Sequence, residues 1–199
     1  MTAALVLVGG YLLGSMPFGY WLVRLLKGED IRRAGSGSIG ASNVWRTYGR
    51  WYGVPVVVLD IAKGFVPALL GTILVGELTG ALAGGLAMLG HWRPLFLRFN
   101  KGGKAVATAS GTLFGIAPLL GLLAMALWLL TFVATRYTSV AAIVVAVALP
   151  FGALVLDEPW PVVVFAGAAA VAVLLLHRPN ITRLRAGTES RFALRRGAA

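Results

Sequence analysis

The stretch AVATASGTLFGIAPLLGLLAMALWLLTFVAT, residues 105–135, decides how often this chain crosses a membrane. It runs for 31 positions without a charge, whereas one membrane-spanning helix needs about 20 residues. Gly115, Pro118 and Gly121 interrupt its middle. We therefore predict two short helices here, over 105–118 and 120–135, which pack within protein or thin the bilayer locally.

The charges around this stretch favour the same division. Basic residues gather in three segments: 27–50, 91–104 and 178–199. Two other connections carry only acids, Glu77 in one and Asp157 with Glu158 in the other. Because lysine and arginine mark cytoplasmic loops, a single helix over 105–135 would put the basic tail outside. We predict an all-α, polytopic membrane bundle of about seven transmembrane helices, with the N-terminus outside and the C-terminus cytoplasmic.

The composition supports a membrane protein. Hydrophobic residues make up 58% of the chain and charged residues 13%, against about 25% charged in soluble domains. The formal net charge is +11, but the basic residues flank apolar runs, so we expect no nucleic-acid partner. Cysteine is absent, and we expect neither metal nor cofactor. We interpret 1–23 as a retained helix without a cleavable signal, and 1–199 as a single domain.

The segment NKGGKAVAT, residues 100–108, has the composition of a phosphate cradle. Glycines let successive backbone N–H groups point at one anion, and a helix that starts after them adds partial positive charge. Its lysines add full charges, but its spacing is not that of a P-loop, which disfavours nucleotide hydrolysis. The alternative is a flexible basic loop that only sets topology.

Two further basic segments carry distinctive patterns. In GSGSIGASNVWRT, residues 35–47, glycines and serines offer donors, and Arg46 offers a planar fork suited to phosphate. A plain linker is the alternative. In HRPNITRL, residues 177–184, His177 and Asn180 lie three apart and share a face if the segment is helical.

Taken in order, these segments resemble the integral-membrane acyl-phosphate:glycerol-3-phosphate acyltransferases of bacteria, the PlsY family. The first family motif reads roughly G-S-G-N-x-G-A-T-N-V-x-R-T-x-G, and residues 35–49 match it except at Ser38 and Ser42. A family D-x-x-K-G corresponds to residues 60–64.

The second family motif, G-H-x-x-P-x-F-x-x-F followed by G-G-K-G-V-A-T, corresponds to residues 90–108. This chain has Ala105 in place of a glycine and one extra residue within 99–101. The third motif, H-R-x-N-I-x-R-L-x-x-G-x-E, corresponds to residues 177–189, with Pro179 at a position that is commonly acidic. The resemblance covers nearly the whole chain.

The resemblance implies a reaction. Members of this family transfer a fatty acyl group from acyl-phosphate to the 1-hydroxyl of glycerol 3-phosphate, which gives lysophosphatidic acid and phosphate in the first step of phospholipid biosynthesis. The expected partners are acyl-phosphate, glycerol 3-phosphate and membrane lipid. The expected location is the bacterial cytoplasmic (inner) membrane, with the active site facing the cytoplasm. A phosphorylated-solute transporter is the main alternative, and a scaffold a third. The sequence predicts no oligomeric state.

The expected site residues fall into three groups. The catalytic group is Ser36, His177 and Asn180. The phosphate-binding group is Arg46, Lys104, Gly102, Gly103, Gly37 and Lys101. The supporting group is Asn43, Asp60, Lys63, His91 and Glu189.

Each role has a structural alternative. Arg46 and Lys104 could anchor the membrane edge, Ser36 could cap its loop, and His177 could cap a helix C-terminus. The paired glycines could act only through their conformation.

The supporting residues are expected to hold elements together. Asp60 and Lys63 are predicted to form an interior ion pair near the cytoplasmic end of their helix. His91 is expected to make a structural hydrogen bond, and Glu189 to tie the tail to a loop arginine.

Overall fold

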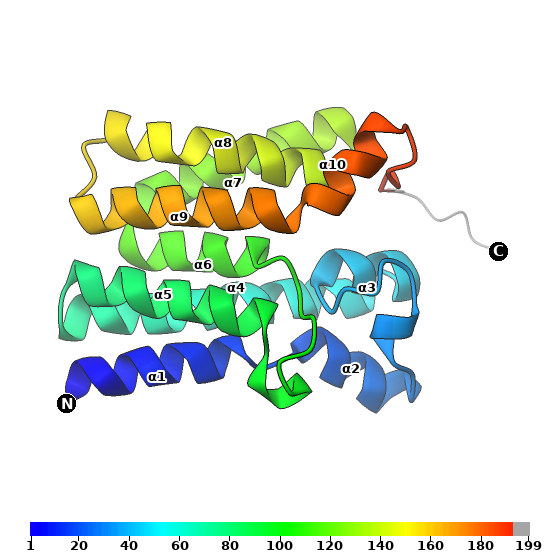
Figure 1. The fold of residues 1–199 in the computed structure, drawn as a ribbon, viewed down its shortest axis with the longest axis horizontal. Helices are drawn as coiled ribbons and strands as arrows, with labels where there is room; N and C mark the ends of the chain where they lie inside the picture. Colours follow the sequence, from blue (N-terminus) through cyan, green and yellow to red (C-terminus); the bar gives the residue numbers. More distant parts are fainter. Residues whose placement is uncertain (193–199) are drawn as a thin grey trace.

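The computed structural model describes residues 1–192, and this part of the chain is all helix and turn, without a strand. The α-helices are α1 (Thr2–Gly14), α2 (Phe18–Lys27), α3 (Ala41–Tyr48), α4 (Arg50–Leu74), α5 (Glu77–Trp92), α6 (Val106–Ile116), α7 (Pro118–Thr135), α8 (Thr138–Val155), α9 (Trp160–Leu176) and α10 (Arg178–Arg185). Two 3-10 turns are η1 (Ile31–Arg33) and η2 (Leu95–Leu97). Helices α1 and α4 to α9 run side by side (Figure 1), so the predicted all-α bundle is confirmed.

The uncharged stretch 105–135 divides as predicted. Helix α6 ends at Ile116 and α7 begins at Pro118, whose missing N–H costs nothing at a first helical position. With 11 residues, α6 is about 16 Å long, well short of a hydrocarbon core of about 30 Å. Most of α6 is buried. The short helix therefore packs within protein, which was one of the two predicted arrangements.

Glycines let α6 lie directly against α4. A Cβ at Gly64 would collide with the carbonyl oxygen of Thr108, and a Cβ at Gly111 with the carbonyl oxygen of Ile61. Each helix thus contributes one glycine to the contact, so the two backbones approach more closely than larger residues permit. Such close approach is typical of packed helices in membranes.

The prediction of one continuous helix over 1–23 is wrong. The chain breaks at Ser15–Pro17, and α2 leaves at an angle of 41° to α1. Pro17 has no N–H to donate, which ends the α-helical pattern. The carbonyl of Met16, freed by the break, accepts a hydrogen bond from Nζ of Lys63 at 3.2 Å. A tertiary contact from α4 therefore stabilises the break.

Three helices in the described part of the chain, α4, α7 and α8, are individually long and apolar enough to cross a membrane. The bent pairs α1–α2 and α9–α10 meet the same criterion when each pair is taken as one span, and α6 is apolar but shorter. The number of seven crossings therefore stays a prediction.

Basic and acidic connections lie at opposite ends of the bundle. The turns after α2 and α5, together with α10, gather at one end, whereas the α4–α5 and α8–α9 connections lie at the other with the N-terminus (Figure 1). Burial and the neighbouring charge of Glu77 raise the pKa of Glu158, so the two acidic connections are close together. The last part of the basic segment 178–199, with Arg195 and Arg196, lies outside the described residues.

Candidate functional site

Two cavities meet at the basic end of the bundle. One has a volume of about 440 Å³ and is walled largely by apolar side chains of α4, α6, α7 and α8; we call it the apolar cavity. The other has a volume of about 770 Å³ and lies between residues 35–47, which include most of α3, the loop at residues 101–104, and helix α10. We call it the basic cavity. Six residues line both: Ser36, Ser38, Asn43, Arg46, Lys104 and Asn180. Polar groups therefore mark the junction.

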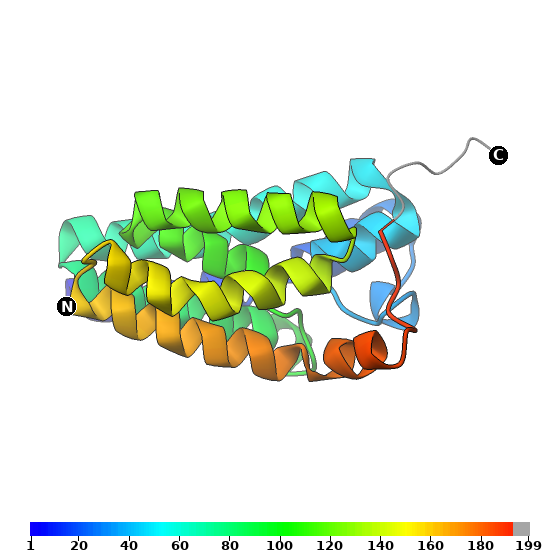
Figure 2. The ribbon, with the colours of Figure 1, turned by 90° about the horizontal axis from the view of Figure 1, so that it is seen from above.

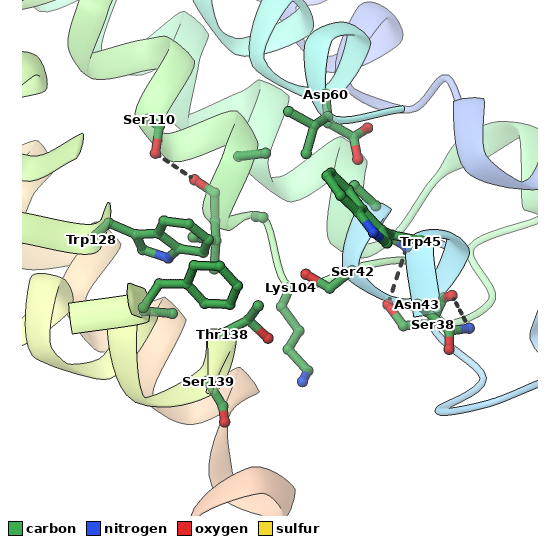
Figure 3. Close-up of a pocket in the computed structure, with 18 of the residues that line it drawn as sticks. Ser38, Ser42, Asn43, Trp45, Asp60, Lys104, Ser110, Trp128, Thr138 and Ser139 are labelled. Atoms are coloured by element: carbon green, nitrogen blue, oxygen red, sulfur yellow. Dashed lines mark hydrogen bonds between the residues drawn. The ribbon is translucent and has the colours of Figure 1, made fainter. Parts of the chain in front are cut away.

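The view into the apolar cavity shows how its sides are arranged. Trp128 and Trp45 lie on opposite sides, and the side chain of Lys104 extends between them (Figure 3). Ser139 lies beyond the end of the Lys104 side chain in this view, and Ser38 and Ser42 lie on the side of Trp45. The ammonium group of Lys104 thus lies in a space with aromatic rings on two sides.

Asn43 orders the loop before α3. Its Oδ1 accepts the backbone N–H of Ser36 at 2.9 Å, and its Nδ2 donates to the carbonyls of Ala34 at 3.0 Å and Ser38 at 2.8 Å. Gly35, with φ +57°, has no room for a Cβ against the Asn43 side chain. The segment is therefore a fixed turn, which disfavours a plain linker, and it holds Ser36 at the junction of the cavities.

Arg46 comes from the last turn of α3 and lines both cavities. Within residues 1–192 its guanidinium has no hydrogen bond or ion pair to a protein group. Burial lowers the pKa of Arg46, and the carboxylate of Glu189 opposes that effect. A half-buried guanidinium with free donors is well suited to a phosphate or carboxylate.

The glycines before Lys104 act differently from the prediction. The N–H of Gly102 donates to the carbonyl of Trp92 at 2.9 Å, and that of Gly103 to the carbonyl of His91 at 3.0 Å. Neither group is free for an anion, so the expected backbone cradle is not formed here. A Cβ on Gly103 would collide with the ring of His91. The glycines instead permit close packing, which was the alternative reading.

Gly37, unlike Gly102 and Gly103, lies outside both cavities. It lines neither cavity, and its N–H donates to the carbonyl of Ala34 at 3.1 Å. Its φ of +70° makes the turn that returns the chain toward α3. Lys101, by contrast, lines the basic cavity as expected of a phosphate ligand, and its role stays a prediction.

The sequence departures from the family motif coincide with unusual backbone. Arg98 and Phe99, beside the extra residue, both have left-handed conformations with φ of 53° and 58°. Ala105, where the motif has glycine, is also left-handed with φ of 57°. An L-residue in this region costs about 1–2 kcal/mol. The loop absorbs the insertion before Lys104, and Lys104 still reaches the junction of the cavities.

A chain of hydrogen bonds links this loop to the C-terminal segment. Lys104 Nζ donates to Asn180 Oδ1 at 2.5 Å, and Asn180 Nδ2 donates to Glu189 Oε1 at 2.6 Å. Ser139 Oγ donates to the same oxygen at 2.7 Å, and Arg183 Nε pairs with Oε2 at 2.7 Å. The arginine that holds Glu189 is therefore in α10, not in a loop as predicted.

His177 lies at the junction of α9 and α10 and lines the apolar cavity. Its Nδ1 lies 2.8 Å from the carbonyl oxygen of Val173. A carbonyl accepts only, so Nδ1 carries the proton and the neutral ring keeps its lone pair on Nε2. The residue thus caps a helix end, as the alternative had it, and also has a nitrogen that can accept a proton.

Asp60, Lys63 and His91 form a buried cluster behind the apolar cavity. Lys63 Nζ lies 2.8 Å from Asp60 Oδ1, so the expected ion pair is present. The pair lies near the middle of α4, at the eleventh and fourteenth residues of the helix, and not near its end as predicted. His91 Nδ1 is 3.6 Å from Asp60 Oδ1 and has no hydrogen-bond partner among the described residues. The structural hydrogen bond expected of His91 is therefore not made by Nδ1.

The structure thus brings most of the predicted residues together. Two lie outside both linings: Gly37 and Lys63. Sequence reasoning did not assign a role to many of the lining residues, among them Trp45, Ser139, Arg183 and Phe192. Trp45 and Arg183 stand inside two of the recognised motifs, which could have marked them. Ser139 and Phe192 lie outside every motif and carry no sequence signal.

This arrangement defines a class: a helical membrane protein with a cationic pocket that opens directly into an apolar one. The model of the family described as glycerol-3-phosphate acyltransferase matches residues 4–187. The relative from Geotalea daltonii is 44% identical over 96% of this chain and 99% of its own length. The one from Rhodospirillum rubrum is 46% identical over 96% and 92%. Both are named glycerol-3-phosphate acyltransferase. The chain belongs to the glycerol-3-phosphate acyltransferase family.

Solved structures agree with the assignment to a membrane protein. The crystal structure of PlsY, an integral membrane glycerol 3-phosphate acyltransferase, in its glycerol 3-phosphate form matches with a TM-score of 0.93. The two chains are 39% identical over 97% of this chain and 96% of that one. The lysophosphatidic acid form of PlsY matches with a TM-score of 0.89 at 37% identity. The expected resemblance to the PlsY family is confirmed.

Anion binding should depend on the charge of Lys104. Burial lowers the pKa of Lys104 to about 8, the nearby cations Arg183, Arg46 and Lys101 act in the same direction, and Glu189 opposes them. The ammonium is charged below that pH and neutral above it. We expect the affinity for sulfate, whose charge is constant over this range, to fall as pH rises through about 8.

Isothermal titration of the detergent-purified protein with sulfate between pH 7 and pH 9 measures this effect. Lys104→Arg is the control, because its guanidinium stays charged and should give a flatter profile. A sulfate affinity that is independent of pH in the unaltered protein would contradict the assignment of Lys104 to the anion site.

Proposed function

We propose that this chain transfers a fatty acyl group from acyl-phosphate to the 1-hydroxyl of glycerol 3-phosphate, giving lysophosphatidic acid and inorganic phosphate. One observation carries the proposal: the basic cavity and the apolar cavity share Ser36, Arg46, Lys104 and Asn180. The reaction joins two phosphorylated substrates, one of which has a long apolar tail. A cationic pocket that opens into an apolar one matches both requirements in a single site.

The forms in which the PlsY structures were solved support the same substrates. One is the glycerol 3-phosphate form and the other the lysophosphatidic acid form. These are the acceptor and the product of the proposed reaction. With 37–39% identity over nearly the whole chain, the same chemistry is the simplest proposal for this protein, acting as a single domain over residues 1–199.

Catalysis in this proposal depends on alignment and charge. Arg46 and Lys104 bind phosphate oxygens and stabilise the charge that develops on the leaving phosphate. Ser36 donates a hydrogen bond to a phosphate or carbonyl oxygen. His177 Nε2 accepts the hydrogen bond of the attacking hydroxyl, since Nδ1 is engaged by Val173.

The bond changes balance without an external base. The 1-oxygen of glycerol 3-phosphate forms a bond to the acyl carbon as the bond from that carbon to the phosphate oxygen breaks. The hydroxyl proton leaves with the departing phosphate, either directly or by way of His177. Because acyl-phosphate is an activated anhydride, no covalent acyl-enzyme is required.

The proposed site faces the cytoplasm, where both soluble glycerol 3-phosphate and acyl donors are made, in a multi-pass protein of the bacterial inner membrane. The gathering of the basic segments at one end of the bundle supports this orientation (Figure 1).

Cysteine labelling tests the orientation. Single cysteines introduced at Ser42, Asn100 and Thr188 should be shielded from membrane-impermeant thiol reagents in intact cells. They should react after the membrane is permeabilised, because they lie on the cytoplasmic side. A cysteine at Glu77 is the matched control and should react in intact cells. Labelling of the first three cysteines in intact cells would show that the orientation is opposite to the proposed one.

Charge removal tests phosphate recognition. Arg46→Ala or Lys104→Ala should lower kcat/KM for glycerol 3-phosphate by about two orders of magnitude, since each loses a charge-assisted hydrogen bond worth about 1.5–3 kcal/mol. Arg46→Lys should restore little, because one ammonium does not replace a bidentate fork. Arg50→Ala is the control, because Arg50 is exposed and lines neither cavity. Near-normal rates in both alanine variants would mean that these charges only set topology.

A comparison of acyl donors tests the whole proposal. Purified protein with glycerol 3-phosphate should form lysophosphatidic acid from acyl-phosphate and not from acyl-CoA or acyl carrier protein. A thioester has no phosphate on its carbonyl, so it would leave buried cations unpaired, at a cost of about 1–3 kcal/mol each. Formation of lysophosphatidic acid at comparable rates from acyl-CoA would refute the donor assignment. No turnover with any donor would favour the transporter alternative.

A further inference from the structure

Phe192 closes the apolar cavity on the side where the described chain ends. Its side chain is 6% exposed and lines that cavity, although it follows the last helix by several residues. After α10, the chain crosses the end of the bundle toward the end of α7 and toward α3 (Figure 2). This placement is unrelated to any motif of the sequence.

The ring of Phe192 bridges two helices that belong to different parts of the bundle. Its centroid is 5.5 Å from that of Trp45 on α3 and 5.4 Å from that of Phe132 on α7, both edge-on. Helix α3 packs on α2 and α4, whereas α7 packs on α6 and α8. Phe132 in turn stacks on Trp128 at 5.1 Å. The four rings form a continuous wall from α3 to α7, and we call it the aromatic wall.

Backbone contacts hold Phe192 in place. Its N–H donates to the carbonyl of Arg136 at 2.8 Å, and Nε of Arg136 donates to the carbonyl of Phe192 at 3.4 Å. The guanidinium of Arg191 lies 5.3 Å from the centre of the Tyr137 ring. Three residues earlier, Glu189 is anchored by Ser139 and Arg183. Residues 189–192 are therefore held by contacts at Glu189, Arg191 and Phe192, and their position does not depend on the Phe192 ring alone.

The aromatic wall lines the same cavity as the proposed reacting groups. Trp45 and Phe192 line the apolar cavity together with Lys104, Asn180 and His177, which surround the proposed acyl-transfer centre. Leu129 also lines this cavity and is 49% exposed, so the cavity reaches the outside of the bundle beside α7. An acyl chain has a lateral path there, while the aromatic wall lines the side of the cavity that runs from α3 to α7.

We propose that Phe192 determines whether the acyl group goes to glycerol 3-phosphate or to water. The inference rests on the proposed function. An acyl-phosphate is an anhydride that water can also attack, with a bond formed from the water oxygen to the acyl carbon as the carbon–oxygen bond to phosphate breaks. The products are a fatty acid and inorganic phosphate. Exclusion of water from the carbonyl suppresses this side reaction, and the ring of Phe192 is the part of the wall contributed by the C-terminal segment.

The test measures how the acyl group is divided between glycerol 3-phosphate and water, and not the overall rate. Purified Phe192→Ala, Phe192→Leu and unaltered protein receive acyl-phosphate and glycerol 3-phosphate, and lysophosphatidic acid and free fatty acid are both quantified. The same mixture without protein gives the background of uncatalysed hydrolysis. The ratio of fatty acid to lysophosphatidic acid should rise severalfold in Phe192→Ala and less in Phe192→Leu, which keeps part of the apolar bulk.

Phe151→Ala is the matched control, since it removes a phenyl ring that is 65% exposed on α8 and lines neither cavity. Thermal unfolding in detergent identifies a variant that does not fold, in which case Phe192→Leu decides. A parallel fall of both products with an unchanged ratio would overturn the inference, because Phe192 would then act only by supporting Glu189. Absence of lysophosphatidic acid with the unaltered protein would instead refute the proposed function.

Discussion

The buried carboxylate of Glu189 is the group on which the charged end of this molecule depends. A carboxylate removed from water is costly unless donors satisfy it. Burial raises the pKa of Glu189, but hydrogen bonds from Asn180, Ser139 and Arg183 outweigh burial and hold the pKa below its ordinary value. These donors come from α8 and α10. Asn180 donates to Glu189 through Nδ2 and accepts a hydrogen bond from Lys104 through Oδ1, so Glu189 also helps to position Lys104. One anion thereby fixes two helices, a loop and the C-terminal segment.

The same carboxylate makes a cluster of cations possible. Arg46, Lys101, Lys104 and Arg183 line one cavity together with a single acid, Glu189. Their mutual repulsion contributes to the lowered pKa of Lys104. The cavity therefore has an excess of positive charge, and a phosphate bound as proposed would balance it. Repulsion among these cations destabilises the empty site, and an anion that enters relieves it, so the relief adds to the free energy of binding. Loss of stability in exchange for function is common at such sites.

The sequence predicted features that depend on local pattern and failed where distant contacts decide. The division of 105–135 was predictable because Gly115, Pro118 and the alternation of charge are local signals. The break at Ser15–Pro17 was missed because Lys63, from another helix, satisfies the carbonyl that the break exposes. Lys104 lies at the junction of the two cavities, and its phosphate-binding role stays a prediction. The backbone cradle predicted for Gly102 and Gly103 is not formed, since only the fold shows that the backbone of α5 accepts their N–H groups. Phe192 was not predictable at all, because an isolated phenylalanine carries no pattern and its partners Arg136, Phe132 and Trp45 are 56 or more positions away.

The short helix α6 explains why a phosphate pocket and an acyl pocket lie side by side. A helix that spans the bilayer completely would occupy the space at the basic end of the bundle. Helix α6 begins only at Val106, and the loop before it leads to the end of the bundle where α3 lies (Figure 1). Lys104, on this loop, lines the basic cavity together with residues of α3 and α10. The N-terminus of α6, with Val106 and Ala107 in the wall of the apolar cavity, adds partial positive charge at the same place. The close glycine contacts between α4 and α6 hold this short helix without lipid on its buried side. The division of the uncharged stretch 105–135 into a short α6 and a longer α7 thus leaves room for the cavity.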